Sequence, residues 1–175
     1  ESVITINSAD ETTLDRIVQL HQKTNQFNLT TVRFGAKDIL AFLGDNNKRI
    51  YVFSLKDKFG DLGIISAAVI SLDLSLGEAS IDSFLMSCRA MGRKAEYSML
   101  SLIISHLHSE GIRSILGLYT RTEKNGPASD FFDNFGFDFV QYDISGKTKI
   151  YSLDASRFFS KNFIEDLGVK VNGTF

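Results

Sequence analysis

The stretch that decides the fold is residues 87–96, which read Ser-Cys-Arg-Ala-Met-Gly-Arg-Lys-Ala-Glu. It follows an apolar run at 79–87 that has the character of a strand, and it leads into residues 95–110, whose apolar spacing predicts an amphipathic helix. A small-residue loop between a strand and a helix leaves several backbone N–H groups unpaired at the positive end of the helix dipole. The stretch therefore predicts a phosphate-binding site.

The composition indicates one domain over residues 1–175, because a chain of this length that is 43% apolar can bury a substantial core. The net charge of −2 supplies no basic field for nucleic acid. Short apolar runs and the absence of a basic-then-apolar start predict a cytoplasmic protein that does not contact a membrane. Cys88 is the single cysteine and the three histidines show no ligand spacing, which predicts neither a disulfide nor a metal site.

Apolar periodicity predicts two early helices, followed by strands and further helices. Ser8-x-x-Glu11 has the form of a capping box and predicts a first helix that runs to about Lys23. Gly111 and Gly136 are expected to close two later helices. The other expected elements are a strand at 2–6, a short helix over 39–43, strands at 50–55, 64–72 and 79–87, a helix over 95–110, a strand at 112–119, a short helix over 127–135, strands at 137–142 and 148–153, and a tail helix around 155–167.

Two motifs and this order of elements resemble the GNAT acyltransferases. Arg89-x-x-Gly92 resembles the loop with which that family holds the diphosphate of coenzyme A. Residues 125–137, Asn-x-x-Ala-x-x-Phe-Phe-x-x-x-Gly-Phe, resemble the part of the family's site that contacts the pantetheine arm. The resemblance implies an α/β fold whose mixed central sheet, flanked by helices, splays between its fourth and fifth strands, with a phosphopantetheine thioester in that cleft.

The same resemblance assigns cofactor contacts and exposes two departures from the family pattern. Phe132 stands where many members carry a Tyr that protonates the departing thiolate, so we expect Phe132 to line the cleft without giving a proton. Lys94 stands where the loop usually has Gly, and a left-handed conformation would cost Lys roughly 1–2 kcal/mol more than Gly. The implied contacts to coenzyme A or phosphopantetheine are Phe84, Met86, Arg89, Gly92, Arg93, Lys94, Ala95, Asn125 and Phe132.

A more specific resemblance covers about residues 14–140. The runs at 23–31, 58–63, 87–96 and 122–125 look like the C-terminal GNAT-like domain of the FkbH-like family. That family usually joins a HAD-type phosphatase domain to this one and makes glyceryl thioesters on acyl carrier protein for methoxymalonyl and tetronate biosynthesis. This chain does not contain the HAD motif, so the resemblance implies two partners, an acyl carrier protein and a HAD-type phosphatase/glyceryltransferase domain.

Cys88 has two open interpretations. A lone cysteine at a strand end is commonly a small buried hydrophobe. In the family context it lies beside the pantetheine path, where Arg89, Arg93 and the following helix N-terminus would favour the reactive thiolate and make Cys88 a nucleophile. The two arginines are themselves either phosphate ligands or solvated charges.

Polar residues between the first two helices are the candidates for acyl recognition. They either bind a small polyhydroxylated acyl group or satisfy the backbone of their own loop, and they are Thr24, Asn25, Gln26 and Asn28. His21 and Asp82 are candidate bases by location, or else a partly buried helix residue and a strand-edge carboxylate.

Together these features predict an acyltransferase-type domain that binds an acyl-coenzyme A or carrier-protein phosphopantetheine thioester in glyceryl-carrier-protein biosynthesis. The alternative is a non-catalytic module that docks a carrier protein while a HAD-type partner performs the chemistry.

Overall fold

Three long apolar strands form the centre of the sheet. β3 (Lys48–Asp57), β4 (Gly60–Asp73) and β5 (Glu78–Met86) pair antiparallel with one another. The buried residues of these strands pack against helices on both faces of the sheet. This explains why polar and apolar residues do not alternate along the strands. The computed structural model describes residues 2–158 and 169–174.

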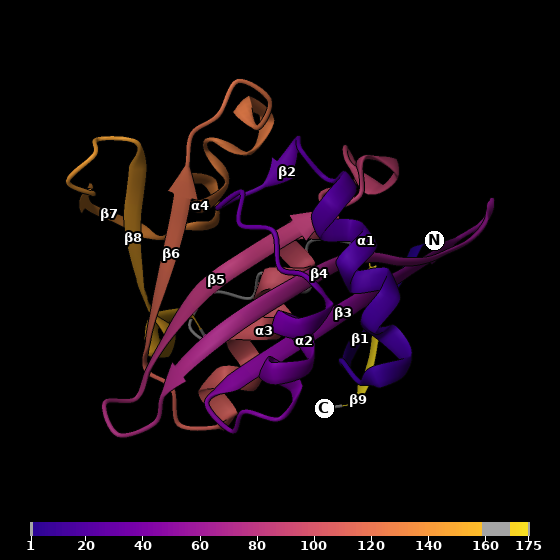
Figure 1. Ribbon diagram of the computed structural model, residues 1–175, viewed down its shortest axis with the longest axis horizontal. Helices are drawn as coiled ribbons and strands as arrows, with labels where there is room; N and C mark the ends of the chain where they lie inside the picture. The colour runs from indigo at the N-terminus through magenta and orange to yellow at the C-terminus, as the bar shows by residue number, and fades with distance from the viewer. Residues whose placement is uncertain (1, 159–168, 175) are drawn as a thin grey trace.

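Around this centre the sheet order is β7-β8-β6-β5-β4-β3-β1-β9, and a short β2 pairs with β5 (Figure 1). The other strands are β1 (Ser2–Ser8), β2 (Phe27–Asn28), β6 (Ser114–Thr120), β7 (Asp138–Tyr142), β8 (Thr148–Asp154) and β9 (Val169–Thr174). The helices are η1 (Glu11–Thr13), α1 (Leu14–Lys23), α2 (Ala36–Leu43), η2 (Cys88–Ala90), α3 (Ala95–Ser109), η3 (Gly126–Ala128), α4 (Phe131–Phe135) and α5 (Ala155–Phe158).

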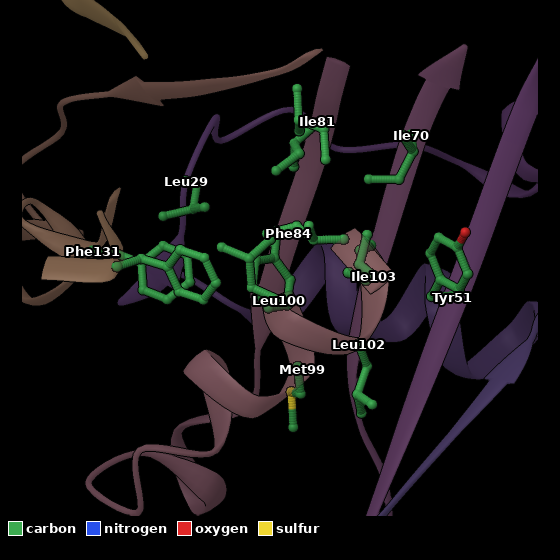
Figure 2. Close-up of a cluster of buried hydrophobic side chains, with 14 of the residues drawn as sticks. Leu29, Tyr51, Ile70, Ile81, Phe84, Met99, Leu100, Leu102, Ile103 and Phe131 are labelled. Carbon is green, nitrogen blue, oxygen red and sulfur yellow. The ribbon is translucent and has the colours of Figure 1, made fainter. Parts of the chain in front are cut away.

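Helices cover both faces of the sheet, and each face has its own hydrophobic cluster. Figure 1 shows α1 and α2 in front of the strands and α3 behind them. Ile17 and Ile39 anchor the front helices against Val52 and its neighbours, whereas Ile103 of α3 belongs to the larger cluster on the opposite face. In Figure 2 the ring of Phe131 lies beside Phe84 within this larger cluster.

The sheet splays between β5 and β6, as the sequence predicts. These two strands are parallel and pair only from Glu78↔Ser114 to Ile81↔Gly117. Beyond that point β5 pairs with β2 through Asn28↔Leu85. The mixed, mostly antiparallel sheet with flanking helices confirms the predicted fold class.

The predicted elements are present, with corrections at the ends of the chain. The cap of the first helical turn is Asp10, whose carboxylate accepts from the N–H groups of Thr12 and Thr13, and not Ser8, which still pairs with Tyr51 as part of β1. Strand β9 pairs parallel with β1 and was not predicted, because a nonlocal parallel pairing leaves little local signal. The expected tail helix begins at 155, and its residues 159–168 lie outside the described residues.

Phe132 lies in the core, so the prediction that it lines the cleft is wrong. Its side chain is 1% exposed and its ring packs against those of Phe137 and Tyr151. It also covers Gly117 of β6, where a Cβ would lie 2.6 Å from the Phe132 ring. Gly117 is therefore required by the close approach of α4 to the sheet.

We predict that Gly117→Ala lowers the free energy of unfolding by about 1–3 kcal/mol, because the added methyl group must displace a fully packed ring. Urea denaturation measures this difference. Gly126→Ala is the matched control, since a Cβ there meets no atom within 4 Å, and it should change stability by less than about 0.5 kcal/mol. Equal effects of the two changes would contradict the packing argument.

Candidate active site

The gap between β5 and β6 is filled by the chain itself. Beyond the β2 ladder, Leu29 N–H donates to Phe84 O at 3.2 Å and Thr120 N–H donates to Leu29 O at 2.8 Å. Residues 27–29 therefore bridge the two strands where they diverge. The ring of Phe27 packs edge-on against Phe84 and Phe131, which leaves Phe84 fully buried. Phe84 is thus a core residue and is not available as the predicted cofactor contact.

Asn125 holds this bridging segment in place. Its Nδ2 donates to Asn28 O at 3.0 Å and to Thr120 O at 2.8 Å. Its Oδ1 accepts from the Tyr119 hydroxyl at 3.0 Å and from Thr122 N–H at 2.8 Å. A side-chain amide has two N–H groups and two lone pairs, so Asn125 is fully engaged and has none left for the predicted pantetheine contact.

We predict that Asn125→Ala lowers the free energy of unfolding by at least about 2 kcal/mol, because each buried polar group left unpaired costs about 1–3 kcal/mol. Thermal and urea denaturation measure the loss. Asn46→Ala, at an exposed loop position, should leave stability nearly unchanged. A stable Asn125→Ala protein would return Asn125 to the role of a ligand residue.

Cys88 lies at the mouth of the large cavity on the α1 side of the sheet. The cavity, here called the thiol groove, measures about 910 Å³ and is lined by α1, residues 24–26, residues 86–89 and residues 123–124. Cys88 begins η2, directly after β5, and its thiol is free and exposed. The interpretation of Cys88 as a buried hydrophobe is therefore wrong, and a nucleophilic role is sterically open.

The thiol groove carries more positive than negative charge. Its cationic side chains are Arg16, Lys23, Arg89 and Lys124, and its carboxylate is Glu123. Arg16 is fixed by donating from Nε to Ile64 O at 2.9 Å, and its pKa is lowered by burial and by the charge of Arg89. These charges suit an anionic ligand whose reactive carbon approaches the Cys88 sulfur.

Three of the four predicted acyl-recognition residues line the thiol groove. Thr24, Asn25 and Gln26 do so, and Asn25 Oδ1 accepts from Arg33 at 2.6 Å. Asn28 is fully buried, where its Oδ1 accepts from Thr31 N–H at 2.9 Å and its amide donates to Thr24 O. Asn28 therefore stabilises its own loop, and it lines a neighbouring cavity and not the thiol groove.

The predicted phosphate loop opens onto a second, smaller cavity. This α3 cavity of about 390 Å³ lies between the start of α3 and η3–α4, and Gly92 lines it. The N–H groups of 92–94 have no hydrogen-bond partner within the described part of the chain. Lys94 has φ +56° and is left-handed, as the loop requires, while Ala95 is buried as the first residue of α3.

The charged side chains around this loop disfavour the binding of a diphosphate. Arg93 forms an ion pair with Asp57 and lowers the pKa of that carboxyl. Glu96 lines the α3 cavity with a buried Oε2 that has no partner among the described residues, and burial raises the pKa of Glu96. Asp130 lines the same cavity. Two carboxyl groups therefore face the space that a phosphate would enter.

The two predicted bases do not line either cavity. His21 is fully buried, with Nδ1 3.2 Å from Val32 O and its ring against Phe34. Asp82 pairs with Lys48 at 2.8 Å and accepts from the Ser71 hydroxyl. Both side chains are bound within the fold, and the structure does not bring them together with Cys88 in the thiol groove.

We predict a loss of stability on acidification that depends on His21. Burial lowers the pKa of His21 in the folded protein, so the unfolded chain binds the proton more readily below the ordinary imidazole pKa of about 6.5. The neutral side chain therefore contributes its full stability above that pH, and this contribution falls as the pH decreases.

Melting temperatures between pH 7.5 and 5.5 measure this dependence. His21→Gln should give a shallower decline than the wild type. Burial also lowers the pKa of His106, so this residue contributes to the decline over the same pH range. The melting temperature of the His21→Gln/His106→Gln protein should therefore depend on pH even less. An unchanged slope in both variants would contradict the assignment.

Sequence reasoning missed part of the thiol groove. Arg16, Gln19 and Lys23 all line it from α1. Their spacing of three and four residues places them on one helix face, and this spacing was the available signal. Glu123 and Lys124 come from the loop after β6 and carry no such pattern.

The described residues contain no helix that is long and apolar enough to cross a membrane. Within the same residues no group of three or more His, Cys, Asp or Glu side chains is arranged to hold a metal ion.

Comparison with known proteins identifies the fold. No family model matches the sequence, and no curated protein matches it. The ribosomal-protein-S18-alanine N-acetyltransferase of Escherichia coli is a structural match at 15% identity and TM-score 0.65, covering 87% of this chain and 94% of that one. A mutant form of the spermidine N-acetyltransferase SpeG of Vibrio cholerae matches at 13% identity and TM-score 0.68, covering 89% and 96%. A domain from Methanocaldococcus jannaschii matches at 13% identity and TM-score 0.68, covering 88% and 99%. The chain therefore has the GNAT fold.

Proposed function

We propose that this protein is an acyltransferase-type domain in which the Cys88 thiol receives an acyl group and passes it to the thiol of a phosphopantetheine, on a carrier protein or on coenzyme A. The observation that carries the proposal is the exposed thiol in a groove rich in cations and in amide and hydroxyl groups. The fold shared with N-acetyltransferases supports acyl transfer as the reaction class.

The chemistry is two successive transfers at one sulfur. The Cys88 thiolate attacks the carbonyl carbon of an acyl phosphate or thioester, a C–S bond forms, and the leaving group departs with its electron pair. The pantetheine thiolate then attacks the acyl-Cys88 carbonyl and releases the Cys88 thiolate. Because both transfers expel a good leaving group, they do not depend on the tyrosine acid that Phe132 replaces.

Arg89 supports this role for Cys88 from its position in the groove. It lines the thiol groove as the next residue in the chain, and its positive charge attracts the anionic part of an acyl donor. Arg93 is paired with Asp57, so we assign it no direct part. Met86 lines both cavities and forms an apolar wall next to the reacting carbon.

The charge around the groove favours an acidic carrier protein as the partner. Two further cavities share Glu123 with the thiol groove. The cationic side chains of these three neighbouring cavities are Arg16, Lys23, Arg33, Arg89, Arg121, Lys124, Lys147 and Lys149, against the carboxylates Glu123 and Asp130. A cationic face on a chain of net charge −2 steers an acidic partner toward one site.

The resemblance to the FkbH-like family suggests the acyl group and the partner that we propose. A HAD-type partner supplies an activated glyceryl group, and Thr24, Asn25 and Gln26 contact its hydroxyl groups in the groove. The product is a glyceryl thioester of the kind used in methoxymalonyl biosynthesis.

A second candidate function is a non-catalytic docking module for a carrier protein. The closed gap between β5 and β6 favours it, because Asn125 and Phe84 are not free to hold pantetheine there. Carrier binding without acyl transfer by the isolated chain would select this function.

We predict that incubation with an activated glyceryl donor and its HAD-type partner produces a protein adduct of one glyceryl group, measured by intact-protein mass spectrometry. Cys88→Ser should prevent the adduct, and holo carrier protein should remove it from the wild type. Arg89→Ala should slow adduct formation about tenfold or more, because the groove loses a positive charge that attracts the anionic donor.

Arg113→Ala is the matched control for the loss of an arginine, since Arg113 is exposed and lies outside the groove lining. Its adduct should form at the wild-type rate. A Cys88 thiol that alkylates readily but never carries an acyl group, while the carrier still binds, would replace the acyltransferase proposal with the docking module.

A further inference from the structure

A short segment, residues 27–29, lies between the thiol groove and the α3 cavity and is here called the wall. Met86 is the residue that lines both, and it pairs across the ladder with Phe27 of β2. Gln26 faces the thiol groove, whereas Phe27 faces the α3 cavity. The backbone at 26–27 therefore lies between the two cavities.

This wall is bonded on both edges. The ladder to Leu85 and Met86 and the bond from Leu29 N–H hold it to β5. Thr120 N–H and the Asn125 amide hold it to β6 and its following loop. Figure 2 shows Leu29 directed into the cluster around Phe131 and Phe84. Opening the wall would break these bonds together and expose two buried apolar side chains.

A coenzyme A molecule that passed between β5 and β6 from one cavity to the other would have to cross this wall. Its diphosphate would lie at the loop N–H groups and its thiol at Cys88. The two carboxyl groups of the α3 cavity, Glu96 and Asp130, add repulsion to that arrangement. Entry through the thiol groove alone requires neither the broken bonds nor the repulsion.

We infer that residues 27–29 act as a specificity-determining wall, so that a pantetheine-bearing ligand reaches Cys88 only from the open side of the thiol groove and does not lie across both cavities. Acyl donor and acceptor then occupy the same groove in turn. The inference rests on the proposed function only in its choice of ligand, because the wall itself is a property of the fold.

The test uses amide hydrogen exchange of the wild-type protein, with and without 5 mM desulfo-coenzyme A. The N–H groups of Leu29 and Thr120 should exchange as slowly as those of the central strands, and the ligand should change neither rate by more than about twofold. Ten-fold faster exchange of both groups on ligand addition, or rapid exchange without ligand, would overturn the inference.

Protection of Cys88 from iodoacetamide separates this inference from the proposed function. Desulfo-coenzyme A and desulfo-4′-phosphopantetheine should protect Cys88 at the same half-maximal concentration, and neither Lys94→Glu nor the exposed control Lys37→Glu should create a difference between them. Ten-fold stronger protection by desulfo-coenzyme A that only Lys94→Glu abolishes would overturn the wall. No protection by either probe, with slow exchange retained, would support the wall and count against pantetheine binding in the groove.

Discussion

The structure depends on the hydrogen bonds that Asn125 makes to the backbone of the segment at 27–29. A parallel pair of strands that diverges leaves unpaired N–H and C=O groups on both inner edges, and buried backbone groups without partners are costly. Here the chain's own segment satisfies those groups on β5 and β6, and one amide side chain fixes the segment to the β6 side. The fold thus gains a bridged sheet and loses the open cleft that the sequence resemblance implies.

Closing the gap moves the candidate chemistry to one face. The exposed thiol of Cys88 lies on the α1 side with Arg16 and Arg89, while the loop N–H groups open onto the other side with Glu96 and Asp130. Electrostatics reinforce this division, because anionic ligands are attracted to the first side and repelled from the second. The covalent acyl-enzyme that we propose fits this division, since one groove would then serve both donor and acceptor.

Sequence reasoning predicted the fold well because its signals are local. The period of α3, the apolar runs of β3 to β5 and the left-handed Gly111 and Gly136 each act within a few residues. The candidate site was predicted less completely, because a motif names residue types and not their partners. Asn125 matches the family motif, and nothing local shows that its four hydrogen-bonding positions are taken by residues up to 97 positions away.

Other errors have the same nonlocal origin. Phe132 was placed in the cleft by its motif position, but the absence of a side chain at Gly117 lets its ring sink into the core. His21 was a candidate base by its location between the first helix and the polar loop, yet its ring packs against Phe34. Cys88 was a candidate because it directly precedes the loop, a relation that the sequence does contain, and the structure shows that its thiol is exposed.

The most direct test of the central claim is the kinetic competence of acyl-Cys88. The acylated protein is separated from its donor, mixed with holo carrier protein, and followed by rapid-quench mass spectrometry. The account predicts that the acyl group moves to the carrier at a rate at least equal to steady-state turnover. An acyl-Cys88 protein that keeps its acyl group while fresh protein, donor and carrier turn over would contradict it.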